Sequence, residues 1–156
     1  VAIVGAALPP LESEGERVLL YIARVLLPVL DRPYCVAYVC AGADDAQTPG
    51  LPFMRQLYTL WDQFWSEQLR GFYVVHARWP LKLTLSMLRP FLSERFGAQL
   101  FLFDSLRELH RCVAPAALRL PERVYAADAQ LNGYSLQAAT QAPAPPSAAS
   151  ANGQLL

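Results

Sequence analysis

The stretch that decides the fold runs from Gly71 to Phe103, GFYVVHARWPLKLTLSMLRPFLSERFGAQLFLF. Its two ends, Phe72–His76 and Leu100–Phe103, are typical of buried strands because they are apolar on both faces. The long segment between them is mostly apolar and is interrupted by Pro80 and Pro90. Strands joined by a crossover of this length pair in parallel, and helices cover the resulting sheet. The stretch therefore predicts an α/β fold.

The residues before this stretch repeat the alternation of strand and helix. The predicted elements are strands at Val1–Leu8 and Pro33–Cys40 and helices at Gly15–Asp31 and Leu51–Arg70. Ser13 and Glu16 have the spacing of a capping box for the first helix, and Gly71 is expected to end the second. Strands that alternate with helices in this way favour a mostly parallel sheet rather than a run of hairpins.

The residues after the stretch complete the predicted domain. Ser105 and Glu108 form a second capping box, which begins a short helix. Arg119–Tyr125 is interpreted as an edge strand, so that the α/β domain has a mostly parallel sheet of about five strands covered by helices. The domain is assigned to residues 1–128. Residues 129–156 are rich in Ala, Pro and Ser without any charge, and we interpret them as a disordered tail.

Composition narrows the classes of function. Hydrophobic residues make up 54% and charged residues 17%, and the net charge is zero, which argues against nucleic-acid binding through bulk charge. No apolar run reaches the length of a transmembrane helix. The three cysteines lack disulfide or metal-site spacing, so we expect a cytoplasmic protein, with peripheral membrane association left open. The chain opens inside a predicted strand, and we take it for part of a longer protein.

Candidate catalytic groups are few. Asp104, Ser105 and His110 could be assembled into a triad, but the capping role explains Ser105 and no GxSxG elbow is present. His110 is interpreted as a surface or cap-region histidine. Asp44 and Asp45 are interpreted as a solvated loop because no third ligand lies nearby in the sequence. We therefore expect no enzyme, no cofactor and no metal.

The segment between the last two strands has more apolar surface than one helix face needs. At helical spacing it presents one polar stripe and two apolar stripes. The stripes are Lys82, Ser86, Arg89 and Ser93; Leu81, Leu85, Leu88 and Leu92; and Leu83, Met87 and Phe91. One apolar stripe remains after the helix docks on a sheet, and leaving it in water forgoes about 1.5 to 3 kcal/mol per side chain. Core, a bound apolar molecule or a partner protein would each cover it.

The region YVVHARWPLKLTLSMLRPFLSERFGAQLFLFDSLRELHRCV resembles the divergent CRAL-TRIO domains, including those of Rho GTPase-activating proteins and of ganglioside-induced differentiation-associated macro-domain proteins. The motif-bearing positions are Tyr73, His76, Lys82, Pro90, Phe91, Ser93, Phe96, Gly97, Ser105, Leu106, Glu108 and Leu109. The chain departs from the family pattern at Ala77 and Arg78, where Pro and Thr are usual. The resemblance spans about residues 1–133.

The resemblance implies a sheet floor and a hydrophobic cavity roofed by residues 81–96, which act as a gate in lipid-transfer relatives. The expected function is a non-catalytic module that holds a phospholipid or other apolar ligand between the sheet and this segment. The alternative is a protein-interaction scaffold that binds small GTPases or self-associates, with a filled pocket. The ligand-binding candidates are Tyr73, Val75, His76, Trp79, Leu83, Met87 and Phe91. The phosphate-contact candidates are Arg78, Lys82 and Arg89.

Overall fold

The computed structural model describes residues 1–134 and contains one parallel sheet. Its strands are β1 (Ala2–Val4), β2 (Tyr34–Val39), β3 (Leu69–Val75) and β4 (Leu100–Phe103). They lie in the order β1-β2-β3-β4, and each neighbouring pair is parallel. The predicted parallel α/β fold is confirmed, with four strands within residues 1–134.

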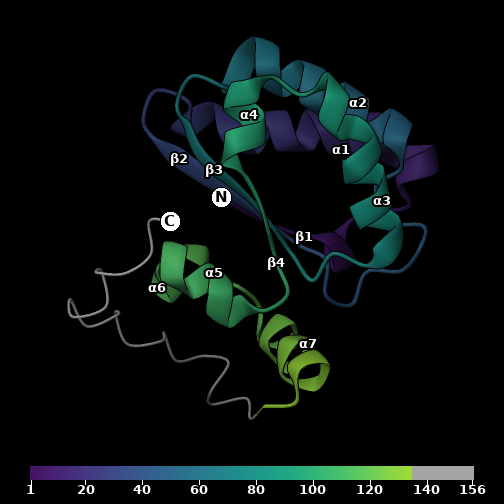
Figure 1. The fold of residues 1–156 in the computed structure, drawn as a ribbon, viewed down its shortest axis with the longest axis vertical. Coiled ribbons are helices and arrows are strands. Elements are labelled where there is room, and N and C mark those ends of the chain that lie inside the picture. Colours follow the sequence, from purple (N-terminus) through teal and green to yellow (C-terminus); the bar gives the residue numbers. More distant parts are fainter. Residues whose placement is uncertain (135–156) are drawn as a thin grey trace, which may run out of the picture.

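Helices cover both faces of the sheet (Figure 1). One face carries α1 (Leu11–Leu26), α2 (Leu51–Leu60), α3 (Trp79–Leu88) and α4 (Glu94–Gln99). The other carries α5 (Leu106–Cys112), α6 (Pro115–Leu118) and α7 (Glu122–Asn132). Shorter turns are the 3-10 helices Gly5–Ala7, Leu27–Val29 and Arg89–Phe91 and the π-helix Trp61–Trp65.

The strand order explains this division. Parallel crossovers are nearly always right-handed, so successive crossovers that step in the same direction place their helices on the same face. The three crossovers here join β1 to β2, β2 to β3 and β3 to β4. Within residues 1–134, the residues after β4 cover the opposite face.

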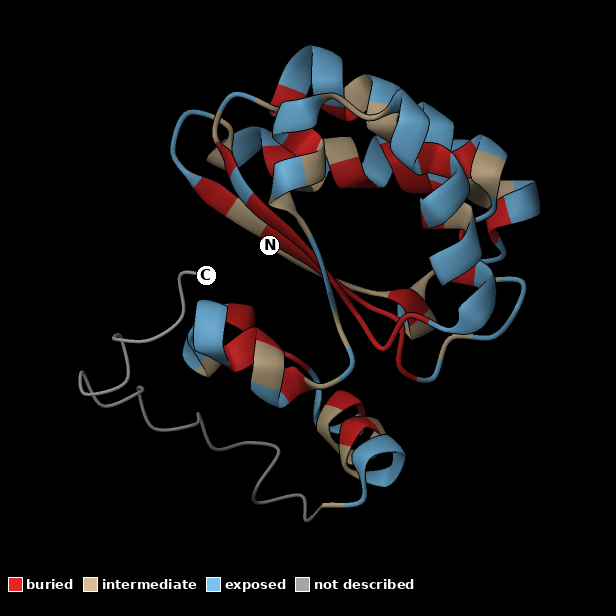
Figure 2. Ribbon diagram, viewed as in Figure 1, coloured by how far each residue is buried: buried red, intermediate tan, exposed pale blue. Residues whose placement is uncertain are grey.

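The alternation of side chains along the strands builds two cores. Val36 and Phe72 face α1–α4, where they join a cluster that includes the fully buried Trp61. Val39 and Val75 face α5–α7 in the second cluster. Figure 2 shows buried residues running along the central strands and on the inward sides of the helices.

Two predicted boundaries of the helices that precede β3 are wrong. Helix α1 begins at Leu11, with Pro10 at the N-cap position, and Ser13 donates to the Pro10 carbonyl at 3.4 Å instead of capping. Pro suits a helix start because it lacks the N–H that would be unpaired there. Gly71 lies within β3 and does not end a helix. By contrast, the second capping box is confirmed, since Ser105 Oγ accepts from the Glu108 N–H at 3.3 Å.

The predicted edge strand at Arg119–Tyr125 is also wrong. Residues 122–132 form α7, with Pro121 at its N-cap position and Val124 buried against the sheet. Pro121 has no N–H to donate to a sheet, whereas its fixed φ suits the approach to a helix. Helix α7 also continues past the expected domain boundary at residue 128. The expected tail lies outside the described residues from residue 135 onward.

None of the helices within residues 1–134 combines the length and the apolar character needed to cross a membrane. The three cysteines, Cys35, Cys40 and Cys112, are free thiols.

Candidate functional site

Helix α3 is the centre of the candidate site because it and the 3-10 turn that follows it carry four of the seven predicted ligand-binding residues, Trp79, Leu83, Met87 and Phe91. It begins after an extended Arg78 with Pro80 in its first turn, and it passes into the 3-10 turn Arg89–Phe91. Pro90 lies in that turn, where a proline interrupts regular α-helical hydrogen bonding. The two prolines thus mark the beginning and the end of α3.

The sheet-facing side of α3 is buried. Leu81, Leu85 and Leu88 are 2%, 5% and 2% exposed. Leu81 and Leu85 belong to the core cluster that also contains Phe72 and Val74. This apolar stripe therefore acts as ordinary core.

The second apolar stripe of α3 lies in solvent. Its members recur every four residues: Trp79, Leu83, Met87 and Phe91 are 73%, 44%, 53% and 58% exposed. We call these four residues the α3 stripe. One edge is bordered by α2, whose Arg55 guanidinium lies 5.1 Å from the centre of the Phe91 ring. Of the three covers that the sequence left open for this stripe, the core is therefore excluded within residues 1–134.

The space under α3 is small. A cavity of about 20 Å³ lies among apolar residues of the sheet, α2 and α3. Its lining includes Phe53, Leu57, Phe72, Val74, Leu81 and Leu85. This volume is close to that of a single water-sized probe, and the apolar lining offers no partner for a water. In this conformation, a lipid chain has no room between α3 and the sheet.

Larger hollows lie elsewhere on the molecule. One of about 530 Å³ lies between β1 and α1, with exposed Arg17 and Tyr21 among its lining residues. Another of about 720 Å³ lies between the first turns of α1 and α2 and includes Glu12 and Asp45. Neither is lined by any of the predicted ligand-binding residues.

Tyr73 and Val75 require a correction, because they lie on the opposite face of the sheet from α3. Alternate residues of a strand point to opposite faces, and these two share the α5–α7 side with Phe103. The Tyr73 ring stacks on the Phe103 ring at 5.7 Å. Neither residue lines the space under α3, so the seven candidates do not form one site.

The Tyr73 ring also explains why residue 71 is glycine. It lies along the strand so closely that a Cβ on Gly71 would come 2.5 Å from the Tyr73 hydroxyl oxygen. Real Cβ atoms do not tolerate such a contact. Gly71 therefore makes room for the flat tyrosine ring.

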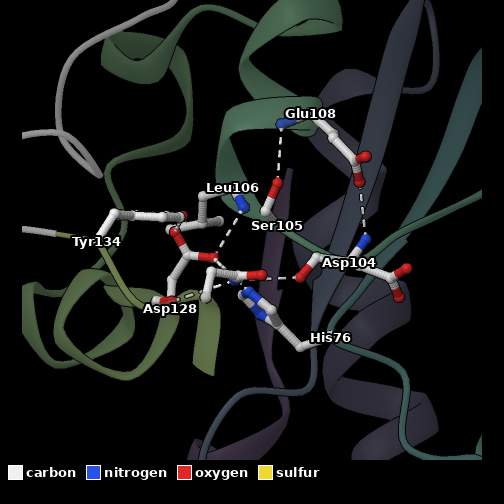
Figure 3. A network of polar contacts seen from close by, with 8 residues as sticks. His76, Asp104, Ser105, Leu106, Glu108, Asp128 and Tyr134 are labelled. Carbon is white, nitrogen blue, oxygen red and sulfur yellow. Dashed lines mark hydrogen bonds and ion pairs between the residues drawn. The ribbon is translucent and has the colours of Figure 1, made fainter. Parts of the chain in front are cut away.

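His76 sits at the end of β3 and belongs to a buried polar network (Figure 3). It has a left-handed backbone, with φ of 58°, and its Nε2 lies 2.6 Å from Asp128 Oδ1. Asp128 is fully buried on α7. It also accepts hydrogen bonds from the Leu106 N–H at 3.0 Å and from the Tyr134 hydroxyl. We call the contact between His76 and Asp128 the His76–Asp128 latch.

The latch holds α7 and the start of α5 against the end of β3. Burial alone would raise the pKa of the Asp128 carboxyl, but hydrogen bonds from His76, Tyr134 and Leu106 hold that pKa below its usual value. None of the hollows described above is lined by His76 or Asp128. The geometry is that of a structural contact between secondary-structure elements.

Sequence reasoning missed Asp128 because it placed the domain boundary there. The available signal was the spacing of Asp128 and Asn132, which puts both polar side chains on one face of a helix. Asn132 Nδ2 donates to Asp128 Oδ1 at 2.9 Å.

His110 is buried, which corrects its interpretation as a surface histidine. It is 6% exposed and lies against Tyr125 of α7, with 6.2 Å between ring centres. Neither ring nitrogen has a hydrogen-bond partner within residues 1–134. Burial lowers the pKa of His110, and the Val113 backbone and the Asp128 carboxylate offset this only in part.

The three phosphate-contact candidates lie at two separate places on the surface. Arg78 reaches the loop after β2, where its Nη1 lies 3.2 Å from Asp45 Oδ1. Lys82 and Arg89 instead line a groove of about 190 Å³ between α3 and β4. Lys82 Nζ lies 3.1 Å from Asp104 Oδ1. Within residues 1–134 no group of three or more His, Cys, Asp or Glu residues could hold a metal ion.

Comparison with known proteins adds a family assignment to this geometry. A family model described as "Divergent CRAL/TRIO domain" matches residues 1–130. The chain is 32% identical over 124 residues to Rho GTPase-activating protein gacY of Dictyostelium discoideum, covering 80% of this chain and 17% of that protein. It is 33% identical over 118 residues to human Bcl-2/adenovirus E1B 19 kDa-interacting protein 2-like protein, covering 76% of this chain and 33% of that protein.

A third relative is Rho GTPase-activating protein 68F of Drosophila melanogaster, 27% identical over 123 residues, covering 79% of this chain and 26% of that protein. The chain thus spans a third or less of each of these curated relatives.

Proposed function

Since the chain belongs to the divergent CRAL/TRIO domain family, we propose that it is a non-catalytic binding module that docks a partner protein on the α3 stripe. The observation that carries this proposal is the exposure of Trp79, Leu83, Met87 and Phe91 along one side of a helix. Burying such a side chain on a partner contributes up to about 1.5 to 3 kcal/mol. Aligned apolar positions at helical spacing suit a continuous contact with a protein surface.

The partner class that we propose to test first is a small GTPase of the Rho type. Two of the relatives described above are named as Rho GTPase-activating proteins, and a third is named as an interacting protein. The proposal gives this chain a docking role without catalysis. His76, a candidate ligand-binding residue, is bonded to Asp128 and lines none of the hollows in which a substrate could bind.

A second candidate function is retention of a lipid or other apolar ligand between α3 and the sheet. The wholly apolar lining of the small cavity favours it, as do the prolines that bound α3. In this mode the buried contacts of Leu81 and Leu85 would separate and α3 would move outward as a gate. A ligand would then replace the core contacts of α3.

Substitutions on the two faces of α3 separate these functions. Binding of a purified Rho-type GTPase would be measured by calorimetry with Leu83→Glu/Met87→Glu. We expect binding to fall about tenfold or more while the free energy of unfolding changes by less than about 0.5 kcal/mol. Leu20→Glu on α1, where Leu20 is 71% exposed, is the matched control and should bind normally. Unchanged binding by the double variant would contradict docking on the α3 stripe.

Retained ligand would be measured in parallel by native mass spectrometry and by transfer from vesicles of phosphatidylcholine and phosphatidylserine. A bound lipid that Leu85→Trp excludes, and that Leu83→Glu/Met87→Glu retains, would support the second candidate. Absence of any lipid in both measurements would leave that candidate without support.

A further inference from the structure

Within residues 1–134, the outer edge of β4 has backbone groups that pair with no other strand. The His76 N–H donates to the Phe103 carbonyl at 2.9 Å, so the backbone of Phe103 faces β3. Successive residues of a strand direct their backbone groups to opposite sides, which turns Leu102 away from β3. Among the described strands β4 pairs with β3 alone. The N–H and carbonyl of Leu102 thus face outward.

This open edge is short and has fixed ends. At one end, the Leu100 N–H donates to the Gly97 carbonyl. Leu100 can therefore offer only its own carbonyl to a neighbouring strand. At the other end, the Asp104 N–H donates to Glu108 Oε2 at 2.8 Å. The edge therefore offers a few groups centred on Leu102 and suits a short extended segment.

The edge also lacks the features that usually prevent strand pairing. Proteins protect an edge strand with charged residues, proline or a bulge. The sequence of β4, LFLF, contains no charged residue and no proline. Its register with β3 is regular, so it has no bulge. Phe101 and Leu102 are 41% and 44% exposed.

A positively charged groove runs beside this edge. Its 190 Å³ lie between Lys82 and Ser86 of α3, Arg89 of the 3-10 turn after it, and Leu100 and Leu102 of β4. No acidic side chain lines it. Arg89 has no ion pair within residues 1–134, and the pair of Lys82 with Asp104 is 46% and 78% exposed. Exposed pairs are weak, so another carboxylate can replace Asp104 at little cost.

We propose that this edge and groove bind an extended acidic peptide, which adds a fifth strand beside β4. The peptide backbone pairs with Leu102. Carboxylates on the face of the peptide that borders the groove meet Arg89 and Lys82, and apolar side chains on its other face lie against the exposed Phe101. Strand addition of this kind draws affinity from main-chain hydrogen bonds and specificity from alternate side chains. The site is separate from the α3 stripe and does not depend on the function proposed for it.

Charge favours an acidic peptide over a second copy of this chain. Symmetric pairing of two β4 strands would use the same surface on both copies. It would bring two grooves that carry Lys82 and Arg89 together without an acidic residue lining either of them. Like charges that face each other across paired strands are destabilising.

The test uses a displayed library of random ten-residue peptides selected on the whole chain. We expect enrichment of sequences that alternate Asp or Glu with β-branched residues. A selected peptide should bind Arg89→Glu about tenfold more weakly or worse. Arg123→Glu on α7, on the other side of the sheet, is the matched charge reversal and should bind normally. Nuclear magnetic resonance should show the Leu102 amide protected from hydrogen exchange in the complex.

Several results would overturn the proposal. These are no enrichment, enrichment of basic or non-alternating peptides, equal binding to Arg89→Glu, or an unprotected Leu102 amide in the complex. A stable dimer by light scattering that Leu102→Lys dissociates would show that a second copy occupies the edge instead. Loss of the α3 stripe through the uncharged variant Leu83→Gln/Met87→Gln should leave peptide binding unchanged, which separates this site from the proposed docking surface.

Discussion

At the scale of single residues, Gly71 has a steric role that its place in a strand does not suggest. Glycine weakens most strands because it lacks a side chain to pack and loses more conformational entropy. Here it allows the Tyr73 ring to lie flat over the sheet and stack on Phe103. The packing of an aromatic ring therefore depends on the absence of one methyl group two residues away.

We expect Gly71→Ala to destabilise the protein by about 1 to 3 kcal/mol, because the new Cβ forces the Tyr73 ring from the sheet. Urea unfolding would measure the change. Gly97→Ala is the matched control: Gly97 lies in α4, and nothing would lie within 4 Å of its Cβ. That variant should be stabilised by about 0.5 to 1 kcal/mol. Equal effects of the two substitutions would contradict the steric role of Gly71.

At the scale of elements, the His76–Asp128 latch decides where α7 lies. Helix α7 contributes only Val124 and Asp128 as fully enclosed side chains. Its position therefore depends on one apolar contact region and one carboxylate. That carboxylate receives hydrogen bonds from the end of β3 and from the start of α5, so it joins three elements.

We expect Asp128→Ala to cost about 3 kcal/mol or more, since it leaves His76 and the Leu106 N–H buried without a partner. Chemical denaturation would give the loss of stability, and hydrogen exchange should show faster exchange of the α7 amides than of the β2 amides. Asp31→Ala, at an exposed turn, should change stability by less than about 0.5 kcal/mol. Similar costs for both variants would show that the latch has little energetic role.

At the scale of the whole molecule, two buried groups should make stability depend on pH in separate windows. The pKa of His110 is lowered in the folded state, so below about pH 6.5 the unfolded chain binds a proton that the folded chain does not. Stability should therefore fall as the pH drops from 7 through 6, by at most about 1.4 kcal/mol per pH unit. The pKa of Asp128 is also lowered, so its contribution is present above about pH 4 and is lost as the pH falls further.

Urea unfolding between pH 7.5 and pH 3 would measure both windows. His110→Phe should flatten the dependence above pH 5 and keep the loss at lower pH, while Asp128→Asn should reduce the loss at lower pH. A wild-type stability that is constant from pH 7.5 to pH 5 would contradict the first assignment.

The sequence predicted the parallel sheet well because its strands are apolar on both faces and are separated by long crossovers. It also predicted that residues 81–96 carry one apolar stripe more than docking on the sheet needs, since the helical spacing leaves only a narrow polar side, but it left open whether core, a ligand or a partner covers that stripe. It did not predict which side of the sheet Tyr73 and Val75 would face relative to α3. That relation depends on the handedness of the crossover and on strand register, which no local pattern specifies.

The errors near the C-terminal end have a different cause. Arg119–Tyr125 has the β-branched and aromatic residues of a strand, but its place after β4 leaves it to cover an open sheet face, and a helix does so. The burial of Asp128 and His110 could not be read from local sequence, because each becomes enclosed only when α5 and α7 pack together.

The placement of every crossover helix on one face has a consequence for synthesis of the protein. A ribosome completes the whole sheet and the α1–α4 layer before it has made α5, α6 and α7. The residues that cover Val39 and Val75 in the second core cluster are therefore the last to be made. If the sheet and the α1–α4 layer fold as they emerge, the nascent chain would have one core assembled and the other exposed as an apolar surface, which is the kind of surface that chaperones bind.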